Sequence, residues 1–472
     1  MIYVSTCIGV IVYILWNYIF FKTYQLCGYK VKNFCKSLFN FNLAFGDKNK
    51  LNFTKRMMRF LILIVLISYG LFFVVNRFTP TPLLLLLNYI VLFFFSPVVL
   101  IIAHFIILPL EEIIKRIYIL KAKKKLSHKK IIKIGITGSF GKTSTKNILT
   151  TLLEKEYKVC SSPQNYNTEM GITKTILSSL DDHDIFIAEM GARHCKDIKK
   201  LADIVRPDYG IITTIGKAHI ESFKSLENIE NTKFELANGL AKHGTMIFNG
   251  DSRSTLKLFE KFDGKKYLTA TEKGFSYAKN IVIDDSGSRF DLVIDGQELS
   301  CQTKLLGRIN INNIVTASTC AYLIGISKED IVSGIKQLQP SSHRLELIKN
   351  QNSIIIDDSY NSNLVGAQEA LEVMSKFPGK KIVVTPGIVE LGNEQSQVNF
   401  TLGAIIADEA DYIIIMNDEN KNYLLSGAIS HNFDRQKIYF CSSRKRQKQL
   451  LSLLSQSGSV ILFENDLPDN FK

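Results

Sequence analysis

The chain has 472 residues, enough for two or three domains that each bury their own core. Its formal net charge of +14 would suit a nucleic-acid binder, but 18 of the Lys and Arg residues lie in residues 1–130 against three acidic residues, and the remainder is close to neutral. Because no basic stripe remains outside that segment, we expect no nucleic-acid partner. The eight cysteines form no CxxC pair, which favours reduced, buried thiols in a cytoplasmic setting over a zinc site or a disulfide framework.

The first 110 residues predict a membrane region with about three transmembrane helices. Apolar runs of sufficient length occupy residues 4–21, 60–76 and 83–110, and the last is long enough to tilt or to kink at Pro97. A signal peptide is the alternative for the first run, but no basic residue precedes it and no small-residue cleavage site follows it. The other alternative is that one run lies in the interface or forms a re-entrant hairpin.

The distribution of basic residues predicts how these helices are oriented. Lys and Arg gather between the first two runs and again after the third, in "KAKKKLSHKK", whereas only Arg77 lies between the second and the third. Since basic loops stay in the cytoplasm, we expect a multi-pass inner-membrane protein with its N-terminus outside. Residues 111–130 would form a basic cytoplasmic linker next to membrane lipids, and the catalytic domains would lie in the cytoplasm.

From residue 131 the pattern predicts an α/β fold. The runs "IIKIGI", "DIFIAE", "YGIITT" and "TMIFN" alternate with helical stretches, which indicates an α/β domain with a mainly parallel sheet over residues 131–340. Because a glycine-rich motif follows the first of these runs, we expect it to be a P-loop-type ATPase domain. A β-rich insertion is expected at about 266–306. After "QPSSHRLELIKNQN", the runs "SIIID", "KIVVT", "DYIIIM" and "SVILF" predict a smaller, Rossmann-like α/β domain over residues 341–472.

A glycine-rich turn, "TGSFGKTS", follows the first of these strands. The standard phosphate loop reads GxxxxGK[ST], and its first glycine would fall on Ile136. Gly138 and Gly141 still allow backbone N–H groups to approach a phosphate. Lys142 would neutralise the β- and γ-phosphates, and the Thr143 hydroxyl would reach Mg²⁺. Taken alone, the turn could also be a glycine-rich bend with an exposed lysine.

Further motifs give the turn its context. The order of eight motifs resembles that of the Mur ligases, most of all the members that join D-alanyl-D-alanine to UDP-N-acetylmuramoyl-tripeptide. The resemblance covers roughly residues 131–400. It implies an ADP-forming ligase that makes an amide through an acyl phosphate, from a carboxylate on a cell-envelope precursor and the amine of an amino acid or dipeptide. The motifs are "TGSFGKTSTK", "QNYNTEMG", "AEMGARH", "IGKAHIESF", "NTKFEL", "HRLE", "IDDSYNSN" and "PGIVELG".

The resemblance also implies an ATP site built from both α/β domains. Two of its residues come from "LGRININN", which matches a family segment near the adenine, and four from the C-terminal domain. The implied ATP-binding residues are Gly138, Ser139, Gly141, Lys142, Thr143, Ser144, Asn310, Asn313, Arg344, Asp358, Tyr360 and Asn361.

By the same resemblance, two Mg²⁺ ions would be held by Thr143, Glu189, His219 and Lys233. Lys233 matches a lysine that is carbamylated to N6-carboxylysine in several family members, which requires a neutral amine and hence a lowered pKa. Lys142, His219 and Lys233 are the implied catalytic residues. Without the motifs around them, Glu189, His219 and Lys233 could equally be a solvated glutamate, an ordinary loop or core histidine and a solvated lysine.

Asn165 and Asn167 match family positions near the substrate, although both could simply be turn formers. Three departures stand beside these matches: Ile309 replaces a histidine near the adenine, Leu364 replaces a proline, and the acidic "ENDLPD" replaces a basic Lys-Gly-Ser-Arg stretch.

By the resemblance, we expect the predicted membrane region to stand in place of the family's UDP-sugar-binding domain. Two alternatives to the implied function follow, namely a ligase that adds amino acids to a lipid-linked glycan or makes a poly-amino acid, and a non-catalytic ATP-binding membrane scaffold.

Overall fold

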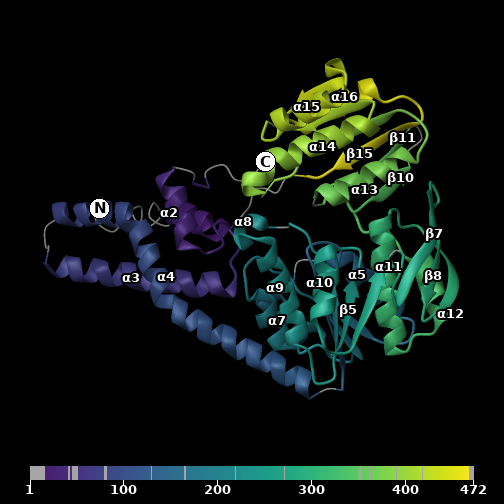
Figure 1. Ribbon diagram of the computed structural model, residues 1–472. Coiled ribbons are helices and arrows are strands. Elements are labelled where there is room, and N and C mark those ends of the chain that lie inside the picture. The colour runs from purple at the N-terminus through teal and green to yellow at the C-terminus, as the bar shows by residue number, and fades with distance from the viewer. Residues whose placement is uncertain are drawn as a thin grey trace. The chain divides into compact units, whose positions relative to one another are not determined.

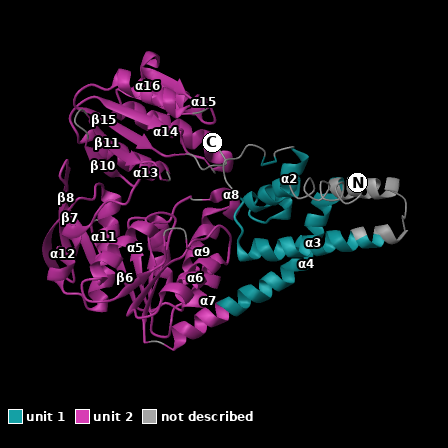
Figure 2. Ribbon diagram, turned by 180° about the vertical axis from the view of Figure 1, so that it is seen from behind, with its two compact units in different colours: residues 1–118 teal, residues 119–472 magenta. Residues whose placement is uncertain are grey.

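The structure is a computed structural model that forms two compact units, residues 1–118 and 119–472 (Figures 1 and 2). It describes residues 16–40, 43–44, 51–78, 82–128, 130–163, 166–217, 219–270, 272–349, 353–360, 363–389, 391–416 and 418–466; inside the helices, the side chains of residues 72, 75–78 and 82–93 lie outside this description.

The first unit is helical. Residues 16–26 are helical, and three helices follow: α2 (Val31–Phe39), α3 (Lys55–Phe78) and α4 (Pro82–Ser127), the last of which runs on into the second unit. Its buried centre is aromatic, with the rings of Tyr24 and Phe60 stacked at 5.2 Å between centroids. The Tyr24 hydroxyl and His104 Nδ1 are hydrogen-bonded, and Arg59 pairs with Glu111 at 2.7 Å.

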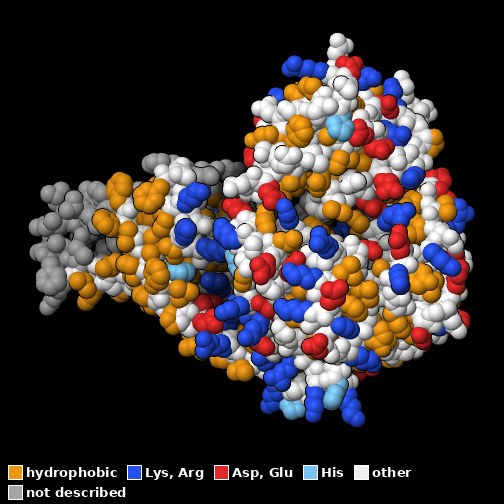
Figure 3. Space-filling model, viewed as in Figure 1, with side chains coloured by type: hydrophobic (Ala, Val, Ile, Leu, Met, Phe, Trp, Pro, Cys, Tyr) orange, Lys and Arg blue, Asp and Glu red, His pale blue; other side chains and the backbone are white. Residues whose placement is uncertain are grey.

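The outer surfaces of α3 and α4 are strongly apolar. Figure 3 shows hydrophobic side chains gathered over these two helices. Side chains such as Val65, Leu66 and Phe105 are each at least 60% exposed. One helical segment in the described part of the chain, Phe94–Ser127, is long and apolar enough to cross a membrane, and its most apolar stretch of 18 residues has a mean hydropathy of 2.1.

The structure describes the three predicted membrane spans to different extents. Residues 4–15 of the first lie outside the described residues, the second falls within α3, and the third falls within α4. With one qualifying segment, the described structure gives no support to a multi-pass arrangement. The helix also continues past residue 110, where the third span was expected to end, because the Glu, Lys and Leu residues that follow are good helix formers even though they are too polar for a bilayer.

The second unit begins with the last turns of α4 and holds two α/β domains. The larger domain has a nine-stranded sheet in the order β2-β3-β1-β4-β5-β6-β7-β8-β9, parallel from β2 to β7 and antiparallel from β7 to β9. The strands are β1 (Ile132–Thr137), β2 (Val159–Ser161), β3 (Ile185–Glu189), β4 (Tyr209–Ile212), β5 (Thr245–Asn249), β6 (Lys266–Ala270), β7 (Ser276–Asp284), β8 (Gly287–Ile294) and β9 (Gln297–Thr303).

The β-rich segment expected at about 266–306 corresponds to β6 through β9. These strands extend the central sheet and do not form a separate layer, because β6 pairs in parallel with β5. The expected strands "IIKIGI", "DIFIAE", "YGIITT" and "TMIFN" fall on β1, β3, β4 and β5.

Helices cover both faces of this sheet (Figure 1). One face packs on α5 (Lys142–Leu153), α11 (Arg308–Ile324) and α12 (Lys328–Gln337). The other face carries α6 (Glu169–Ser179), α7 (Asp197–Val205), α8 (Ile220–Phe223), α9 (Leu226–Asn238) and α10 (Arg253–Lys261). Alternate residues of the central strands point to opposite faces, so Ile185 and Phe186 enter different cores.

The end of α4 is part of the second core. Ala122 and Leu126 are buried among the side chains that cover the α6 and α7 face. Lys125 pairs with Asp181 at 2.8 Å and donates to the Leu177 carbonyl at 3.3 Å. This last part of the helix is therefore fixed to the α/β domain.

The smaller domain has a six-stranded sheet in the order β10-β11-β15-β12-β13-β14, in which only β10 is antiparallel to its neighbour. Its strands are β10 (Glu346–Lys349), β11 (Ser353–Asp358), β12 (Lys381–Thr385), β13 (Tyr412–Met416), β14 (Ile438–Cys441) and β15 (Ser459–Glu464). Its helices are α13 (Leu364–Ser375), η1 (Gly392–Glu394), α14 (Gln395–Glu409), α15 (Lys421–Ser430), η2 (Arg435–Lys437) and α16 (Arg444–Leu454).

Candidate functional site

The glycine-rich turn joins β1 to the first residue of α5, at the carboxyl edge of the central sheet. Gly141 precedes the helix with φ of 80°, which glycine adopts without strain. A Cβ atom there would lie 2.6 Å from Asn313 Oδ1, and one on Gly138 would overlap Thr213 Oγ1. Backbone N–H groups at the start of α5 are free of intrahelical partners, so this turn has the form of an anion-binding loop.

Neighbouring segments hold the turn in shape. Ser139 Oγ donates to the Gly216 carbonyl at 2.8 Å, and Thr213 Oγ1 donates to the Phe140 carbonyl at 2.5 Å. Thr143 is buried in the first turn of α5, and Thr145 donates to Asn313 Oδ1 at 3.1 Å. The predicted residue Asn313 therefore lies behind the loop and supports it from α11.

Lys142 bends over the loop. Its Nζ donates to the carbonyl oxygens of Gly138 at 2.8 Å and Ser139 at 3.0 Å. Burial lowers the pKa of Lys142 to about 8, the Glu189 carboxylate opposes this shift, and the positive charge of Arg344 adds to it. A carboxylate and two cations thus act on one another around the loop.

Glu189 ends β3 beside the loop and forms an ion pair that the sequence did not point to. Its Oε2 lies 3.2 Å from Lys146 Nζ, and both side chains are 3% exposed. Lys146 also donates to the Ser162 carbonyl at 2.8 Å, while Ser162 Oγ accepts from the Glu189 N–H at 3.0 Å. Lys146 stands in the quoted motif "TGSFGKTSTK", but no role was predicted for it.

Lys233 lies on α9 with 3% of its surface exposed. Burial lowers its pKa to about 7, and the positive charge of Lys142 lowers it further, against the opposing carboxylates of Asp197 and Glu235. Within the described part of the chain, no hydrogen bond or ion pair holds its ammonium group. A buried amine with a pKa lowered in this way has a substantial neutral fraction near neutral pH, as carbamylation requires.

His219 precedes the short helix α8 in the left-handed region, with φ of 54°. The loop that carries it also carries Lys217, which contacts both carboxylate oxygens of Glu394 in the smaller domain at 2.8 and 3.0 Å.

The two predicted substrate asparagines lie in the segment before α6. Asn165 lies outside the described residues. Asn167 packs its side chain against Gly191, and its backbone carbonyl accepts a hydrogen bond from the Gly191 N–H at 2.9 Å.

The connection between the domains carries Arg344 toward the loop. Arg344 lies between His343 and Leu345, which have φ of 63° and 51°. Its guanidinium stacks 4.2 Å from the centre of the Tyr360 ring, and its buried Nε has no hydrogen-bond partner. A buried, unsatisfied guanidinium nitrogen fits an anionic ligand at this place.

Asp358 lies beside this arginine at the end of β11. Burial raises its pKa to about 6, while the hydrogen bond that its Oδ1 accepts from the Leu345 N–H at 3.0 Å and the positive charge of Arg344 oppose the shift. Asn361, predicted to act with Asp358 and Tyr360, lies outside the described residues.

A cavity of about 160 Å³ brings several predicted residues together. Its lining includes three of the predicted ATP residues, Ser144, Asn310 and Arg344, from α5, α11 and the connection. Ile309, which stands where the family has histidine, does not line it; its N–H donates to Glu369 on α13 at 3.3 Å, and the Arg308 N–H donates to the same oxygen. Glu369 was not predicted from the sequence.

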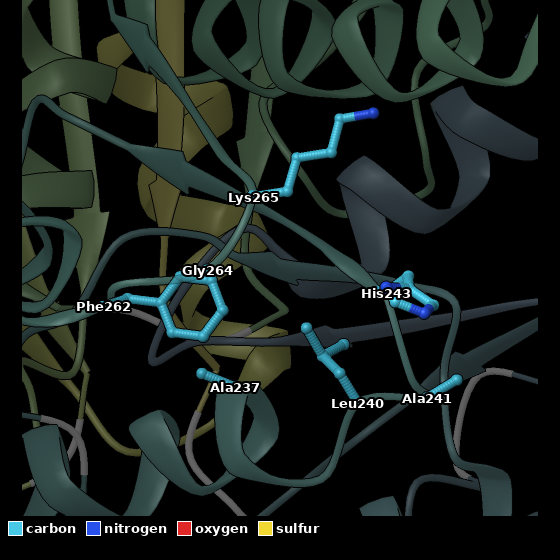
Figure 4. A pocket seen from close by; sticks show the side chains of 8 residues that line it. Ala237, Leu240, Ala241, His243, Phe262, Gly264 and Lys265 are labelled. Carbon is cyan, nitrogen blue, oxygen red and sulfur yellow. The ribbon is translucent and has the colours of Figure 1, made fainter.

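A larger cavity of about 470 Å³ lies elsewhere. It is formed where α9 ends and where β5 and β6 begin, at the amino edge of the sheet, opposite the glycine-rich turn (Figure 4). Leu240, Phe262 and His243 line it, and none of the predicted site residues does. We therefore place the candidate site at the smaller cavity and the loop next to it.

Glu189 is the described residue best suited to bind a metal ion at this site. Among the described residues, no three His, Cys, Asp or Glu side chains form a ready-made metal cluster. Glu189 Oε2 is taken by Lys146, whereas its Oε1 accepts no hydrogen bond within the described part of the chain. One free carboxylate oxygen beside a phosphate loop suits Mg²⁺, which keeps several waters and needs few protein ligands.

Comparison with known proteins assigns the family. Residues 136–321 match the Mur ligase middle domain, and residues 343–464 match the Mur ligase glutamate ligase domain. The chain therefore belongs to the Mur ligases. It is an ATP-dependent enzyme that joins an acid to an amino acid.

Individual relatives agree with this assignment. The chain is 29% identical over 334 residues to the UDP-N-acetylmuramoyl-tripeptide–D-alanyl-D-alanine ligase of Bacillus subtilis, covering 70% of this chain and 72% of that one. Its fold is similar to MurF from Acinetobacter baumannii (TM-score 0.69, 24% identity, 75% and 77% coverage) and to MurF from Thermotoga maritima in complex with ADP (TM-score 0.69, 23% identity, 75% and 80% coverage).

Proposed function

We propose that the protein is a membrane-attached, ATP-dependent carboxylate–amine ligase that acts through an acyl phosphate on a cell-envelope precursor. The observation that carries the proposal is the grouping of Lys142, Glu189 and Lys233 at one edge of the central sheet, with Arg344 reaching the same place from the smaller domain. The site thus combines a phosphate loop, a buried carboxylate and a buried, easily neutralised amine.

The proposed reaction has two steps. A carboxylate oxygen of the precursor attacks the γ-phosphorus of ATP, and ADP leaves with the electrons of the broken P–O bond. The amine nitrogen then attacks the acyl carbon, phosphate leaves, and the amine loses its proton. The loop amides of Gly138 and Gly141 would cradle the phosphates, Lys142 would neutralise their charge, and Ser144, Asn310 and Arg344 would hold the nucleotide.

The remaining ATP contacts would come from the smaller domain. We assign Asp358, Tyr360 and Asn361 to the nucleotide, with Ser139, Thr143 and Asn313 shaping the loop. Closing the two domains over ATP would exclude water and protect the acyl phosphate from hydrolysis.

Two Mg²⁺ ions would be held by Thr143, Glu189, His219 and the carbamate of Lys233. Bound there, they would supply charge neutralisation for the transferred phosphoryl group. The lowered pKa of Lys233 supports the carbamate, because only a neutral amine adds CO₂. The free Oε1 of Glu189 supports the metal.

The name of the Bacillus subtilis relative suggests UDP-N-acetylmuramoyl-tripeptide and D-alanyl-D-alanine as substrates. Asn165 and Asn167 would contact the acceptor. A second candidate function is amino-acid addition to a lipid-linked glycan, and the acidic stretch that replaces a basic one of the family favours it. This stretch begins at the buried Glu464, where β15 ends. It also contains Asp466, which pairs with Arg444 at 3.4 Å.

Membrane attachment is proposed from the first unit. The apolar outer surfaces of α3 and α4 would be costly in water, and the segment Phe94–Ser127 has the length and hydropathy of a span. We propose that lipid covers these surfaces while the α/β domains stay in the cytoplasm, where ATP is available.

Product analysis of the full-length protein tests the reaction. With ATP, Mg²⁺ and candidate carboxylate and amine pairs, we expect ADP and phosphate in equal amounts with the amide product. AMP and pyrophosphate would refute the acyl phosphate. The Lys142→Ala variant should lose turnover, whereas Lys242→Ala, on an exposed loop, should not. ATP binding without any product from either substrate class would favour a scaffold.

A further inference from the structure

Lys146 and Glu189 are two opposite charges that the fold takes out of water together. Each side chain is 3% exposed, and their charged atoms lie 3.2 Å apart. Removing a single charge from water costs several kcal/mol by general estimates, so neither residue would remain charged at this depth without the other. Lys146 lies on α5, the helix that follows the phosphate loop, and Glu189 lies at the end of β3.

The pair is also tied to a third segment. Ser162, in the loop that follows β2, accepts from Lys146 Nζ through its carbonyl at 2.8 Å. Its hydroxyl oxygen accepts from the Glu189 N–H at 3.0 Å. The carboxylate is therefore fixed both through its backbone and through its Oε2, and its rotamer has little freedom.

The two oxygens of the Glu189 carboxylate differ in their partners. Lys146 takes Oε2, and Oε1 accepts no hydrogen bond among the described residues. The Nζ of Lys146 is occupied by the Ser162 carbonyl and by Glu189 Oε2. Lys142, four residues earlier, is half-buried and places its Nζ over the loop carbonyls instead.

We propose that Lys146 is a positioning residue that fixes the Glu189 carboxylate so that Oε1 is presented to the divalent cation bound with the nucleotide. This inference rests on the proposed metal role of Glu189 and adds a residue to which no role is otherwise assigned. Partners of this kind, which orient a metal ligand without touching the metal, typically change metal affinity by about 10- to 100-fold when they are removed.

The test measures binding and does not depend on turnover. Fluorescent mant-ADP is bound to the full-length protein while Mg²⁺ is titrated, and again in EDTA. In Lys146→Met, which removes the charge and keeps most of the length of the side chain, the Mg²⁺ concentration at half-effect should rise by about tenfold or more. Binding of mant-ADP in EDTA should stay at the wild-type level, because the loop and the nucleotide cavity are untouched.

Three further variants make the result specific. Lys146→Arg retains the charge and donors and should recover most of the Mg²⁺ response. Lys242→Met removes a lysine from an exposed loop and should behave as wild type. Combined with Glu189→Gln, Lys146→Met should add nothing, because a residue that acts through Glu189 has no effect once Glu189 is lost.

The outcomes separate the two hypotheses. If Glu189→Gln weakens the Mg²⁺ response while Lys146→Met leaves it unchanged or strengthens it, the positioning role is wrong and the metal role of Glu189 stands. If Glu189→Gln has no effect on the Mg²⁺ response, the metal role fails, and the inference fails with it. If Lys146→Met also loses binding in EDTA while Lys146→Arg binds Mg²⁺–mant-ADP no better, the lysine is merely structural and the inference is overturned.

Discussion

The Glu369 carboxylate, on α13 of the smaller domain, accepts a hydrogen bond from the backbone N–H of Arg308, the first residue of α11 in the larger domain. The next N–H, that of Ile309, donates to the same oxygen at 3.3 Å. First-turn N–H groups have no partner inside their own helix, so a residue from one domain caps a helix of the other. The helix that it caps also carries Asn310 and Asn313.

We therefore expect Glu369→Ala to weaken both folding and nucleotide binding. Losing a helix cap costs about 0.5–2 kcal/mol, and the start of α11 would loosen beside the cavity. Thermal unfolding and the KM for ATP measure the two effects, and both should worsen. Glu372→Ala, on an exposed position of the same helix, is the matched control; equal behaviour of the two variants would contradict the interdomain cap.

Gly141→Ala should impair nucleotide binding through a specific collision. Its φ of 80° disfavours any side chain, and the new methyl group would lie 2.6 Å from Asn313 Oδ1. Gly296→Ala introduces similar backbone strain, at φ of 74°, where no heavy atom lies within 4 Å. Comparing mant-ADP affinity between the two variants isolates the contact with Asn313. An effect of the same size in both would show that this contact does not matter.

Burying Lys233 should cost stability in a pH-dependent way. Its pKa falls from 10.5 in the unfolded chain to about 7 in the folded protein. The cost of burying the charged form is therefore fully present below about pH 7 and disappears as the pH rises toward 10.5. Lys233→Met should exceed the wild type in stability at pH 6 by more than at pH 9, as denaturant unfolding would show. A difference independent of pH would contradict the lowered pKa.

The same residue gives an activity prediction. If its carbamate holds Mg²⁺, wild-type turnover should fall as the pH drops through about 7, because the ammonium form does not add CO₂. Added bicarbonate should restore part of the turnover just below that pH. Lys233→Ala should be inactive and unresponsive to bicarbonate but should recover with small carboxylic acids that take the place of the carbamate. Full activity of Lys233→Ala would remove this role.

Attachment to lipid should depend on the outer surface of α3 and α4. Leu66→Glu and Phe105→Glu place charges on positions that are 62% and 60% exposed, where a bilayer would have to accommodate them. Both should lower the fraction of protein that remains with membranes after a carbonate wash. Leu453→Glu, at a 75% exposed position on α16, should not. Equal release of all three would mean that these surfaces do not contact lipid.

The sequence predicted best what is encoded locally. Apolar β-branched runs predicted β1, β3, β4 and β5, because a buried parallel strand must be apolar on both faces. The two glycines and the lysine predicted a tight turn between a strand and a helix, which the structure has between β1 and α5, and its role as a phosphate loop stays a prediction. The predicted third span ended at residue 110, and the helix that contains it, α4, continues to Ser127, because charged residues end a membrane span without ending a helix.

What the sequence did not predict depends on distant segments meeting. Glu369 caps a helix that begins 61 residues earlier, and Lys146 pairs with a carboxylate 43 residues away. A lone Glu on a helix or a Lys after a phosphate loop is ordinarily solvated, so neither carries a local signal. The short strands β2, β10 and β14 were also missed, since three or four residues give too little alternation to recognise.

His343 and Leu345, on either side of Arg344, both have left-handed backbone conformations that cost a residue with a side chain about 1–2 kcal/mol each. Contacts with the end of β11 offset this cost: the His343 carbonyl accepts from the Tyr360 N–H at 3.0 Å, and the Leu345 N–H donates to Asp358 Oδ1 at 3.0 Å. The direction of Arg344 is therefore set by the smaller domain rather than by the dihedral preferences of the link itself. A substitution at the end of β11 would disturb the arginine without touching it.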